Sequence, residues 1–290
     1  MNNVELSTVY LPLLDEVYKD SVKTSILDGD EATVKKGQNG EIKVAKLDMD
    51  ALGDFDRNSG YTEGSTSLKW ETIKYDKERS QKLHIDRLDN EESLGVAVAK
   101  LSSEFFRTKV APETDAARIA KIAGTQGVSK KEETLTTGDA MYAALRACTN
   151  KMDEDEVPQE NRILFITPTG KGLLEDLESY KSKEVLSRFS QIIPVPQSRM
   201  YTAITLRNGK DVEGNSKFGY TKAAGASDIN FLAVEKSAAV TAMEQYLKYF
   251  APDEDQNGDS HVFPYRNYNL YGHVYENKLA GVYVSYKPAE

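Results

Sequence analysis

The sequence predicts an α+β fold in which two strand-like segments and one long helix precede a compact mixed unit. Three observations support this prediction. Partly alternating apolar residues flank a polar, glycine-containing stretch at 52–64, helical periodicity runs from residue 89 to 124, and short strand-like patterns recur between residues 162 and 286. This order favours a protein that assembles, because a small enzyme rarely needs so long a helix.

The N-terminal region, residues 1–36, is expected to form an arm. Leu13 and Val17 mark one short amphipathic turn, and the turn-prone sequence Asp28-Gly29-Asp30 follows it. A segment of this kind is suited to docking on a neighbouring molecule.

Residues 37–88 are expected to form an extended loop with flanking strands. Ile42 and Val44 belong to the outgoing strand, and the returning strand carries Leu68, Trp70, Ile73 and Tyr75. The connection at 52–64 is too polar to be buried and too long for a tight hairpin turn. An isolated two-stranded ribbon is only marginally stable in water, so we expect this one to lie on another surface.

A single long helix is expected over residues 89–124. Asp89 and Glu92 form an acidic capping box, which places the start near Asn90. Apolar residues then recur at helical spacing through Leu94, Val98, Leu101, Phe105, Pro112, Ala116, Ile119 and Ala123. Because Pro112 removes a backbone donor, the helix should kink near Thr108 rather than end there. At about 1.5 Å per residue it spans roughly 50 Å, far beyond the globular average of about 11 to 12 residues.

Residues 125–236 are expected to form the compact mixed unit, and residues 237–290 return to strand-like composition. A helix is expected at 172–177, after a cap at Thr167-Pro168. The candidate strands are 162–166, 192–195, 229–234, 240–250, 262–275 and 279–286.

Three polar segments are interpreted as boundaries within the compact unit. The stretch 124–137 is expected to be a loop, Asp139 to cap a helix that ends near Lys151, and the acidic run 153–156 to be a solvated exit. The helix should bury Met141, Leu145 and Cys148 on one side.

Composition limits the compartment and the partners. The formal net charge of −9 is poorly suited to gripping phosphate backbones. No apolar run approaches the ~20 residues that cross a bilayer, and acidic residues stand where a signal peptide would be basic, so we expect a cytoplasmic start. The single cysteine, Cys148, excludes an intrachain disulfide, and a buried structural thiol is favoured over a reactive one.

No short chemical motif is complete. The segment 169–172 lacks the upstream glycine and following hydroxyl of a phosphate loop, and 253–258 begins like a calcium loop but has Pro264 where glutamate is required. The histidines have no zinc-ligand spacing; they are His84, His261 and His273. We therefore expect no catalytic, cofactor-binding or metal-binding residues.

The stretch 52–124 resembles the extended-loop and spine-helix region of tailed-bacteriophage major capsid proteins of the Hong Kong 97 fold. The resemblance is carried by Gly60-Tyr61, the return strand LKWET, the helix entry DxxDNEES and the sequence EFFRTKVAPETDAARIAKIAG. Weaker similarity extends to both ends, where LDEVYKDSVKTSIL resembles the family's N-terminal arm and VYENKLAGVYVSYK resembles its closing strands.

This resemblance implies a Hong Kong 97-like subunit with an N-terminal arm (1–36), an extended β-hairpin loop (37–88), a spine helix (89–124), an axial domain (125–236) and peripheral-domain strands with a closing strand (237–290). It implies self-assembly as hexamers and pentamers into an icosahedral shell around phage double-stranded DNA, bound without sequence specificity. Portal, separate scaffolding, and head-completion or decoration proteins are the implied partners, with no membrane. The implied location is the virion capsid, and the host cytoplasm during assembly.

The resemblance also suggests roles for individual residues. Phe55, Tyr61 and Trp70 are the expected contacts between subunits, although packing within the ribbon is a competing interpretation for each, and stacking of Trp70 on nucleic acid is another. The expected hinges are Gly53, Gly60, Gly64 and Pro112.

The chain departs from the wider family in two respects. Many members carry an N-terminal scaffold segment that a protease removes, whereas the arm here begins almost at Met1, so a separate scaffolding protein or none is expected. Some members cross-link a lysine to an asparagine. The candidate participants here, which no local motif assigns, are Lys43, Lys46, Lys69 and Asn267 or Asn269.

Two other functions fit the sequence. An encapsulin-like compartment shell shares the fold but stores enzyme cargo instead of DNA. A soluble α/β hydrolytic enzyme, using the carboxylate-rich loops, is the alternative from a different class.

Overall fold

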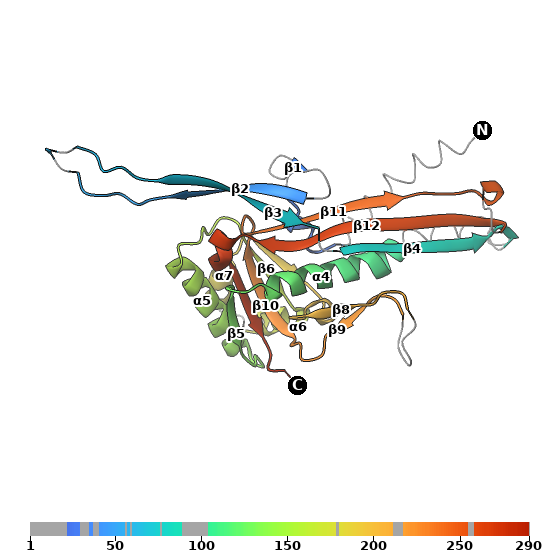
Figure 1. Cartoon of the computed structure of the whole chain (residues 1–290). Coiled ribbons are helices and arrows are strands. Elements are labelled where there is room, and N and C mark those ends of the chain that lie inside the picture. Colours follow the sequence, from blue (N-terminus) through green and yellow to red (C-terminus); the bar gives the residue numbers. More distant parts are fainter. Residues whose placement is uncertain are drawn as a thin grey trace. The chain divides into compact units, whose positions relative to one another are not determined.

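The computed structural model describes residues 22–29, 35–36, 41–55, 57–58, 60–75, 77–88, 104–177, 180–210, 217–254 and 258–289. The chain divides into a small unit, Gly29–Asp76, and a large unit formed by the rest (Figure 1). The expected amphipathic turn at Leu13 and Val17 and the first apolar positions of the long helix, 94–101, lie outside the described residues.

A five-stranded mixed sheet lies at the centre of the large unit, in the order β5-β13-β10-β6-β7. Its strands are β5 (Ser129–Glu132), β6 (Arg162–Ile166), β7 (Gln191–Pro194), β10 (Ile229–Glu235) and β13 (Val282–Tyr286). β10 is antiparallel to both neighbours, and the outer pairs are parallel. Every residue of β6 and β10 is buried, which explains why these strands are nearly continuous apolar runs.

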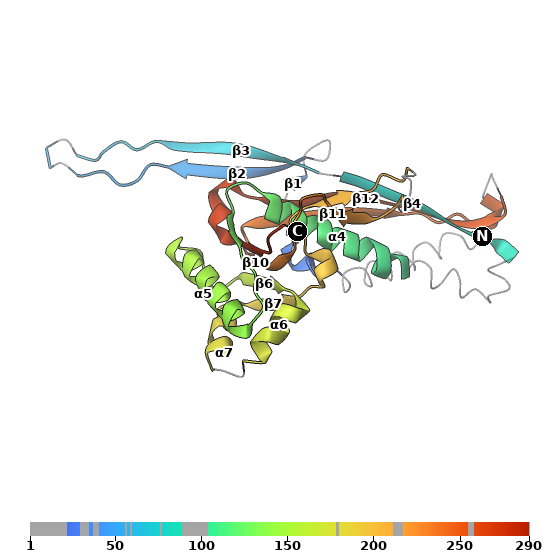
Figure 2. The ribbon, with the colours of Figure 1, turned by 90° about the horizontal axis from the view of Figure 1, so that it is seen from below.

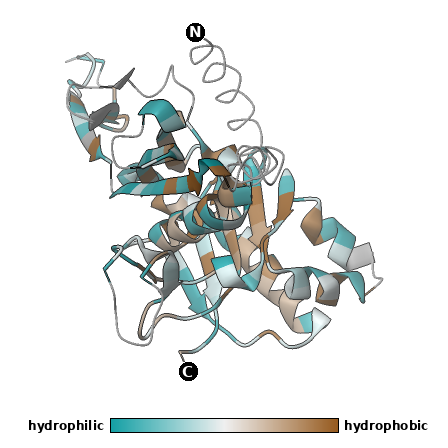
Figure 3. Ribbon diagram, turned by 90° about the vertical axis from the view of Figure 1, so that its right-hand side faces the viewer, coloured by the Kyte–Doolittle hydropathy of each residue, from teal (hydrophilic) through white to brown (hydrophobic). Residues whose placement is uncertain are grey.

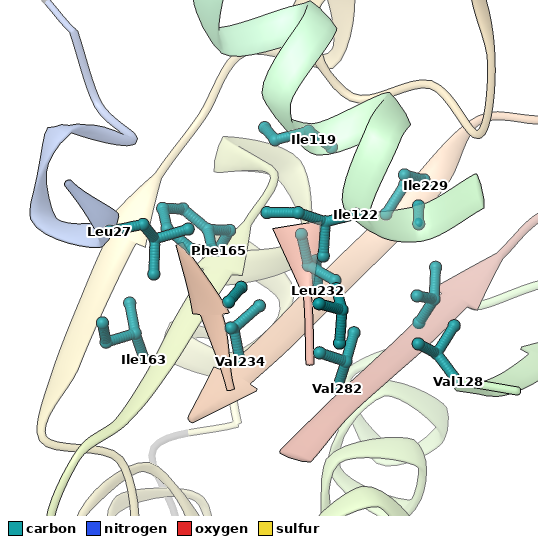
Figure 4. Packing of buried hydrophobic residues seen from close by; sticks show 14 of the residues in the cluster. Leu27, Ile119, Ile122, Val128, Ile163, Phe165, Ile229, Leu232, Val234 and Val282 are labelled. Atoms are coloured by element: carbon teal, nitrogen blue, oxygen red, sulfur yellow. The ribbon is translucent and has the colours of Figure 1, made fainter. Parts of the chain in front are cut away.

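Different helices cover the two faces of this sheet. α4 (Ala111–Gly124) places Ile119 and Ile122 in one cluster with residues such as Phe165 and Leu232 (Figure 4). The opposite face is covered by α5 (Gly138–Glu154), α6 (Pro168–Glu175) and α7 (Tyr180–Leu186) (Figure 2). Hydrophobic residues accordingly gather in the central strands and in the helix faces toward them (Figure 3).

A second, antiparallel sheet of the large unit has the order β11-β12-β4. Its strands are β11 (Ala239–Leu247), β12 (Ser260–Val274) and β4 (Lys77–Asp86). The Tyr265 ring meets Phe105 and Phe106, edge to face, at 5.8 and 4.9 Å. At Gly272 an added Cβ would lie 2.8 Å from Ile122, so helix and strand approach closely there. α4 therefore packs on both sheets.

The remaining elements are short. They are η1 (Ser25–Leu27), η3 (Gln197–Arg199), β8 (Ile204–Leu206), β9 (Tyr220–Lys222), η4 (Pro252–Glu254) and η5 (Glu276–Gly281). β8 and β9 form an antiparallel pair.

Helix ends were the least accurate sequence predictions. α5 is capped by Thr137, whose Oγ1 accepts from the Ala140 N–H at 3.3 Å, and not by Asp139. It continues to Glu154 rather than ending near Lys151. The predicted helix at 172–177 instead begins at Pro168 and ends at Glu175, with Thr167 as the expected cap. The predicted buried side of α5 is confirmed by Met141, Leu145 and Cys148.

Two segments expected to be loops are ordered parts of the fold. The stretch 124–137 contains β5, an edge strand whose polar sequence matches its exposure to solvent. In the acidic run 153–156, Asp153 pairs with the fully buried Arg162 at 2.7 Å, so this carboxylate is not merely solvated. Conversely, Leu279 lies in η5 and not in a strand, since β13 begins at Val282.

The buried carboxylate of Asp115 joins the N-terminal segment to α4. It accepts from the N–H groups of Lys23 and Thr24 at 3.1 and 3.0 Å, and from the Thr24 hydroxyl at 2.8 Å. Arg199 Nη1 donates the fourth bond at 2.9 Å. Each carboxylate oxygen thus accepts two bonds, which compensates for burying the charge.

Arg118, one turn further along α4, also binds the N-terminal segment 22–28. Its buried guanidinium pairs with Asp28 at 2.7 Å. Asp28 also accepts from Thr241 Oγ1 at 2.8 Å and forms a parallel bridge to that residue of β11. Residues 22–28 are therefore fixed to the helix and to the second sheet.

Replacing Asp115 by asparagine should lower the free energy of unfolding by about 3 to 5 kcal/mol, because Arg199 then lacks its buried counter-charge. Urea unfolding of the purified protein, followed by circular dichroism, measures the loss. The control Glu104→Gln breaks an exposed pair with Arg107 and should change stability by less than about 0.5 kcal/mol. Equal effects of the two substitutions would contradict the role of Asp115.

Candidate assembly surface

The small unit is a hairpin with a regular register. β2 (Glu41–Met49) pairs antiparallel with β3 (Thr66–Lys74), from Glu41 opposite Lys74 to Met49 opposite Thr66. β1 (Lys35–Lys36) adds a short third strand beside β2. The predicted outgoing and returning strands are confirmed, except that Tyr75 lies just beyond β3.

One side of the hairpin carries its large solvent-exposed apolar residues. Directly opposite residues share a face, and faces alternate along each strand. The register therefore places four residues together, here called the apolar face: Leu47, Met49, Leu68 and Trp70. The four large side chains are between 52% and 65% exposed. A contiguous apolar patch left in solvent is typical of an interaction site.

The other side, here called the polar face, contains Lys46 opposite Lys69 and Asp48 opposite Ser67. Glu71 lies on the same side, next to Val44. Like charges that stand directly opposite one another destabilise an isolated ribbon and favour exposure to water. Between Lys46 and Met49 and between Ser67 and Trp70 the hairpin is therefore two-sided, and in this part the apolar face is the one suited to burial against protein.

At the tip, two of the predicted contact residues touch each other. The Phe55 and Tyr61 rings lie 5.1 Å apart at an interplanar angle of 64°. They nevertheless remain 57% and 91% exposed. Thr62 Oγ1 donates to the carbonyl of Asp54 at 3.0 Å and so closes the tip. Packing within the ribbon accounts for the ring contact, while most of Tyr61 stays available to a partner.

Three residues of this surface were not among the predicted contacts. Leu47, Met49 and Leu68 lie on the same side of the hairpin as Trp70, which was predicted. For Leu47 and Met49 the signal is the strict alternation within 45–49, where charged residues interrupt the apolar ones, and Leu68 was already assigned to the returning strand. Only the register shows that the apolar positions of both strands share one face.

The three tip glycines differ in the structural reason for having glycine at that position. Gly60 has φ +89°, a conformation that favours glycine. At Gly53 an added Cβ would lie 2.8 Å from Thr62 Oγ1, so close packing is the requirement there. At Gly64 the nearest atom would be Asp50 Cβ at 3.8 Å, an ordinary contact.

The helix leading into α4 is irregular at the predicted place. A π-helical turn, η2 (Phe106–Val110), immediately precedes α4, in which Pro112 occupies the first turn. Since Pro112 has no N–H to donate to the carbonyl of Thr108, a wider turn accommodates it without ending the helix. Upstream, Arg87 and Leu88 are helical and Asp86 accepts from the Leu88 N–H at 2.9 Å, whereas the predicted helix start near Asn90 lies outside the described residues.

An ion pair braces the helix just after the π-helical turn. Arg79 on β4 binds Glu113 with two nitrogens, at 2.6 and 3.0 Å, and also donates to the carbonyl of Arg207. Burial opposes the charge of Arg79, but its hydrogen bonding and attraction to Glu113 outweigh burial and raise its pKa. The irregular turn is thus bounded by a fixed segment of α4.

The other residues considered for a chemical role are buried or lie within a regular element. Cys148 is fully buried, and burial raises the pKa of its thiol. The segment 169–172 lies within α6. Asn267 and Asn269 on β12 are buried within the chain. Across the described ranges there is no cluster of three metal-ligating side chains and no helix long and apolar enough to span a membrane.

Substituting Gly60 by alanine should loosen the tip, because the left-handed backbone costs an alanine about 1 kcal/mol or more. Hydrogen exchange of the Asp50 and Ser65 amides, which pair across the base of the tip, should accelerate. Gly64→Ala is the matched control and should leave exchange unchanged. Equal exchange in both variants would contradict a special role for Gly60.

The fold is shared with solved capsid structures, although no protein-family model and no curated protein matches the sequence. A structure from Gordonia phage Cozz matches with a TM-score of 0.59 and 14% identity over 93% of this chain and 87% of its own. The capsid structure of cyanophage P-SCSP1u matches with a TM-score of 0.55 and 16% identity over 89% and 86%. The virus-like particle from Pyrococcus furiosus matches with a TM-score of 0.54 and 14% identity over 95% and 99%. The chain therefore has an α+β fold of the Hong Kong 97 type.

Proposed function

We propose that this protein is the major capsid protein of a tailed bacteriophage, with a structural and not a catalytic role. Copies self-assemble as hexamers and pentamers into an icosahedral shell that encloses double-stranded DNA. The observation that carries the proposal is the solvent-exposed apolar face of the hairpin, in a chain that has the fold of capsid subunits over nearly its whole length.

The hairpin supplies contacts that a single subunit cannot make. Phe55, Tyr61 and Trp70, together with Leu47 and Leu68, lie against a neighbouring subunit. Completing the burial of one such half-exposed side chain is worth on the order of 1 kcal/mol. Each subunit gains several of these contributions, and the shell repeats them at every copy, so weak individual contacts sum to a stable particle.

The proposed organisation follows the family. Residues 1–36 are the N-terminal arm, 37–88 the extended loop, 89–124 the spine helix, 125–236 the axial domain and 237–290 the peripheral strands with the closing strand. The continuity of α4 across both sheets supports its role as a strut.

Non-identical positions in the shell require one chain to adopt several shapes. Pro112 and the glycines Gly53, Gly60 and Gly64 are the proposed hinges. The π-helical turn before Pro112 supports a bend in the helix, and the positive φ of Gly60 supports a bend at the tip.

The net charge favours a shell that contains DNA over a protein that recognises a DNA sequence. At −9 the chain repels phosphate, so packaged DNA stays mobile and is not bound by sequence. The proposed location is the virion capsid, with assembly in the host cytoplasm. Portal, scaffolding, and head-completion or decoration proteins are the proposed partners.

An encapsulin-like compartment shell is the second candidate. It is favoured by the similarity to the Pyrococcus furiosus virus-like particle, which covers 95% of this chain and 99% of that one. The two candidates differ in content, because a compartment holds enzyme cargo where a phage capsid holds DNA.

Purified protein should form shells visible by negative staining after size-exclusion chromatography. Particles from infected cells should protect DNA against nuclease, whereas co-purifying enzyme without DNA would favour the compartment. A protein that stays monomeric at high concentration, with no capsomers, tubes or shells, would overturn both candidates.

Replacing Leu47 by glutamate should raise the protein concentration needed for assembly by at least about tenfold, because it places a charge in the buried contact. The stability of the isolated subunit should change by less than about 0.5 kcal/mol, since Leu47 is exposed there. Lys46→Glu is the control: it introduces the same residue one position away, on the polar face. If the two variants assembled equally well, the apolar face would not be the contact.

A further inference from the structure

β3 is the edge strand of the hairpin sheet. The order β1-β2-β3 leaves one side of β3 without a neighbouring strand among the described residues. Its residues 68–70 are exposed to solvent. A long, regular edge with exposed apolar residues presents N–H and C=O groups that another strand can pair with. Natural proteins usually protect such an edge, so we ask which strand pairs with β3.

The sequence of β3 is complementary to itself about Trp70. In an antiparallel pair of two copies centred on this residue, Lys69 of one copy stands opposite Glu71 of the other, twice by symmetry. Leu68 stands opposite Thr72, and the two Trp70 side chains face each other. We propose that β3 pairs with β3 of a second copy in this register, which joins two hairpins into one sheet across a two-fold axis.

Charge selects this register over its neighbours. Centring the pair on Lys69 would set two lysines against each other, and centring it on Glu71 would set two glutamates together. Registers in which the two strands are offset by one residue would place the apolar face of one copy beside the polar face of the other. Among the registers that match the faces, only the Trp70-centred one sets opposite charges of β3 directly against each other.

Pairing gives the two hairpins a wider sheet and a larger apolar surface than either has alone. Two isolated ribbons become a wider sheet, with backbone hydrogen bonds along the joined edges. The apolar faces become continuous through the two Trp70 residues, which doubles the surface offered to the rest of the shell. This inference names the partner of the hairpin and rests on the proposed function for its biological setting.

Cysteine cross-linking tests the register directly in the full-length chain. In the proposed pair, Trp70→Cys places two thiols directly opposite, within about 5.5 Å between Cβ atoms, close to disulfide distance. Leu68→Cys, on the same face, places its thiols roughly 14 Å apart along the strands. Under a mild oxidant we expect dimers on a non-reducing gel from Trp70→Cys only. The native Cys148 is buried and adds little background.

Charge reversal then tests the complementarity. In the Trp70→Cys background, Lys69→Glu or Glu71→Lys alone should lower the dimer yield about tenfold, because each creates two like-charge contacts. The double variant restores complementarity and should restore the yield, which also excludes misfolding as the cause. Lys46→Glu, on β2, should leave the yield unchanged.

Three results would overturn the pairing: no dimer from Trp70→Cys, dimers of equal yield from Leu68→Cys, or no rescue in the double variant. Negative staining of the same samples separates this inference from the proposed function. Shells without Trp70→Cys dimers would refute the pairing and leave the capsid role intact. Dimers in a protein that never forms shells would support the pairing and refute the capsid role.

Discussion

A two-stranded ribbon cannot bury its own apolar face, and the proposed assembly of this protein depends on that constraint. The alternation in β2 and β3 gathers Leu47, Met49, Leu68 and Trp70 on one side, where the register leaves them in solvent. A chain with an extensive internal core elsewhere has no need of such a patch for its own stability. The proposed contacts between copies would account for the patch, and the fold that the chain shares with solved capsid structures is consistent with them.

The large unit is held together by a helix that packs on both of its sheets and by buried charges. α4 packs on two sheets, the central one through Ile119 and Ile122 and the second one near Tyr265. Buried charges hold the N-terminal segment to this helix through Asp115 and Arg118. Burying these charges costs desolvation energy, so their value lies in specifying one arrangement of segments that are about ninety residues apart in sequence. The π-helical turn before Pro112 interrupts the regular hydrogen-bond pattern of the helix, which is why the proposed hinge is placed there.

The sequence was sufficient to predict the elements whose signals are local and strong. The apolar runs of β6 and β10, the paired strands of the hairpin and the irregularity before Pro112 were all identified. The sequence was insufficient where neighbours decide the outcome. β5 looked like a loop because an exposed edge strand can be polar, and the interior ion pair of Arg162 depends on a residue that only tertiary structure brings near. The apolar face was only partly predicted, since its membership depends on the register between two strands rather than on either one.

The most direct test of the central claim is oxidative footprinting of the hairpin before and after assembly. Hydroxyl radicals, followed by mass spectrometry, report the solvent access of Met49 and Trp70 in free subunits and in purified particles. Assembly should reduce their oxidation strongly, while Met141 and Met152, which are buried in the subunit core, should be protected in both states. Equal oxidation of Met49 and Trp70 in subunits and particles would contradict the claim that this face is covered by neighbouring copies.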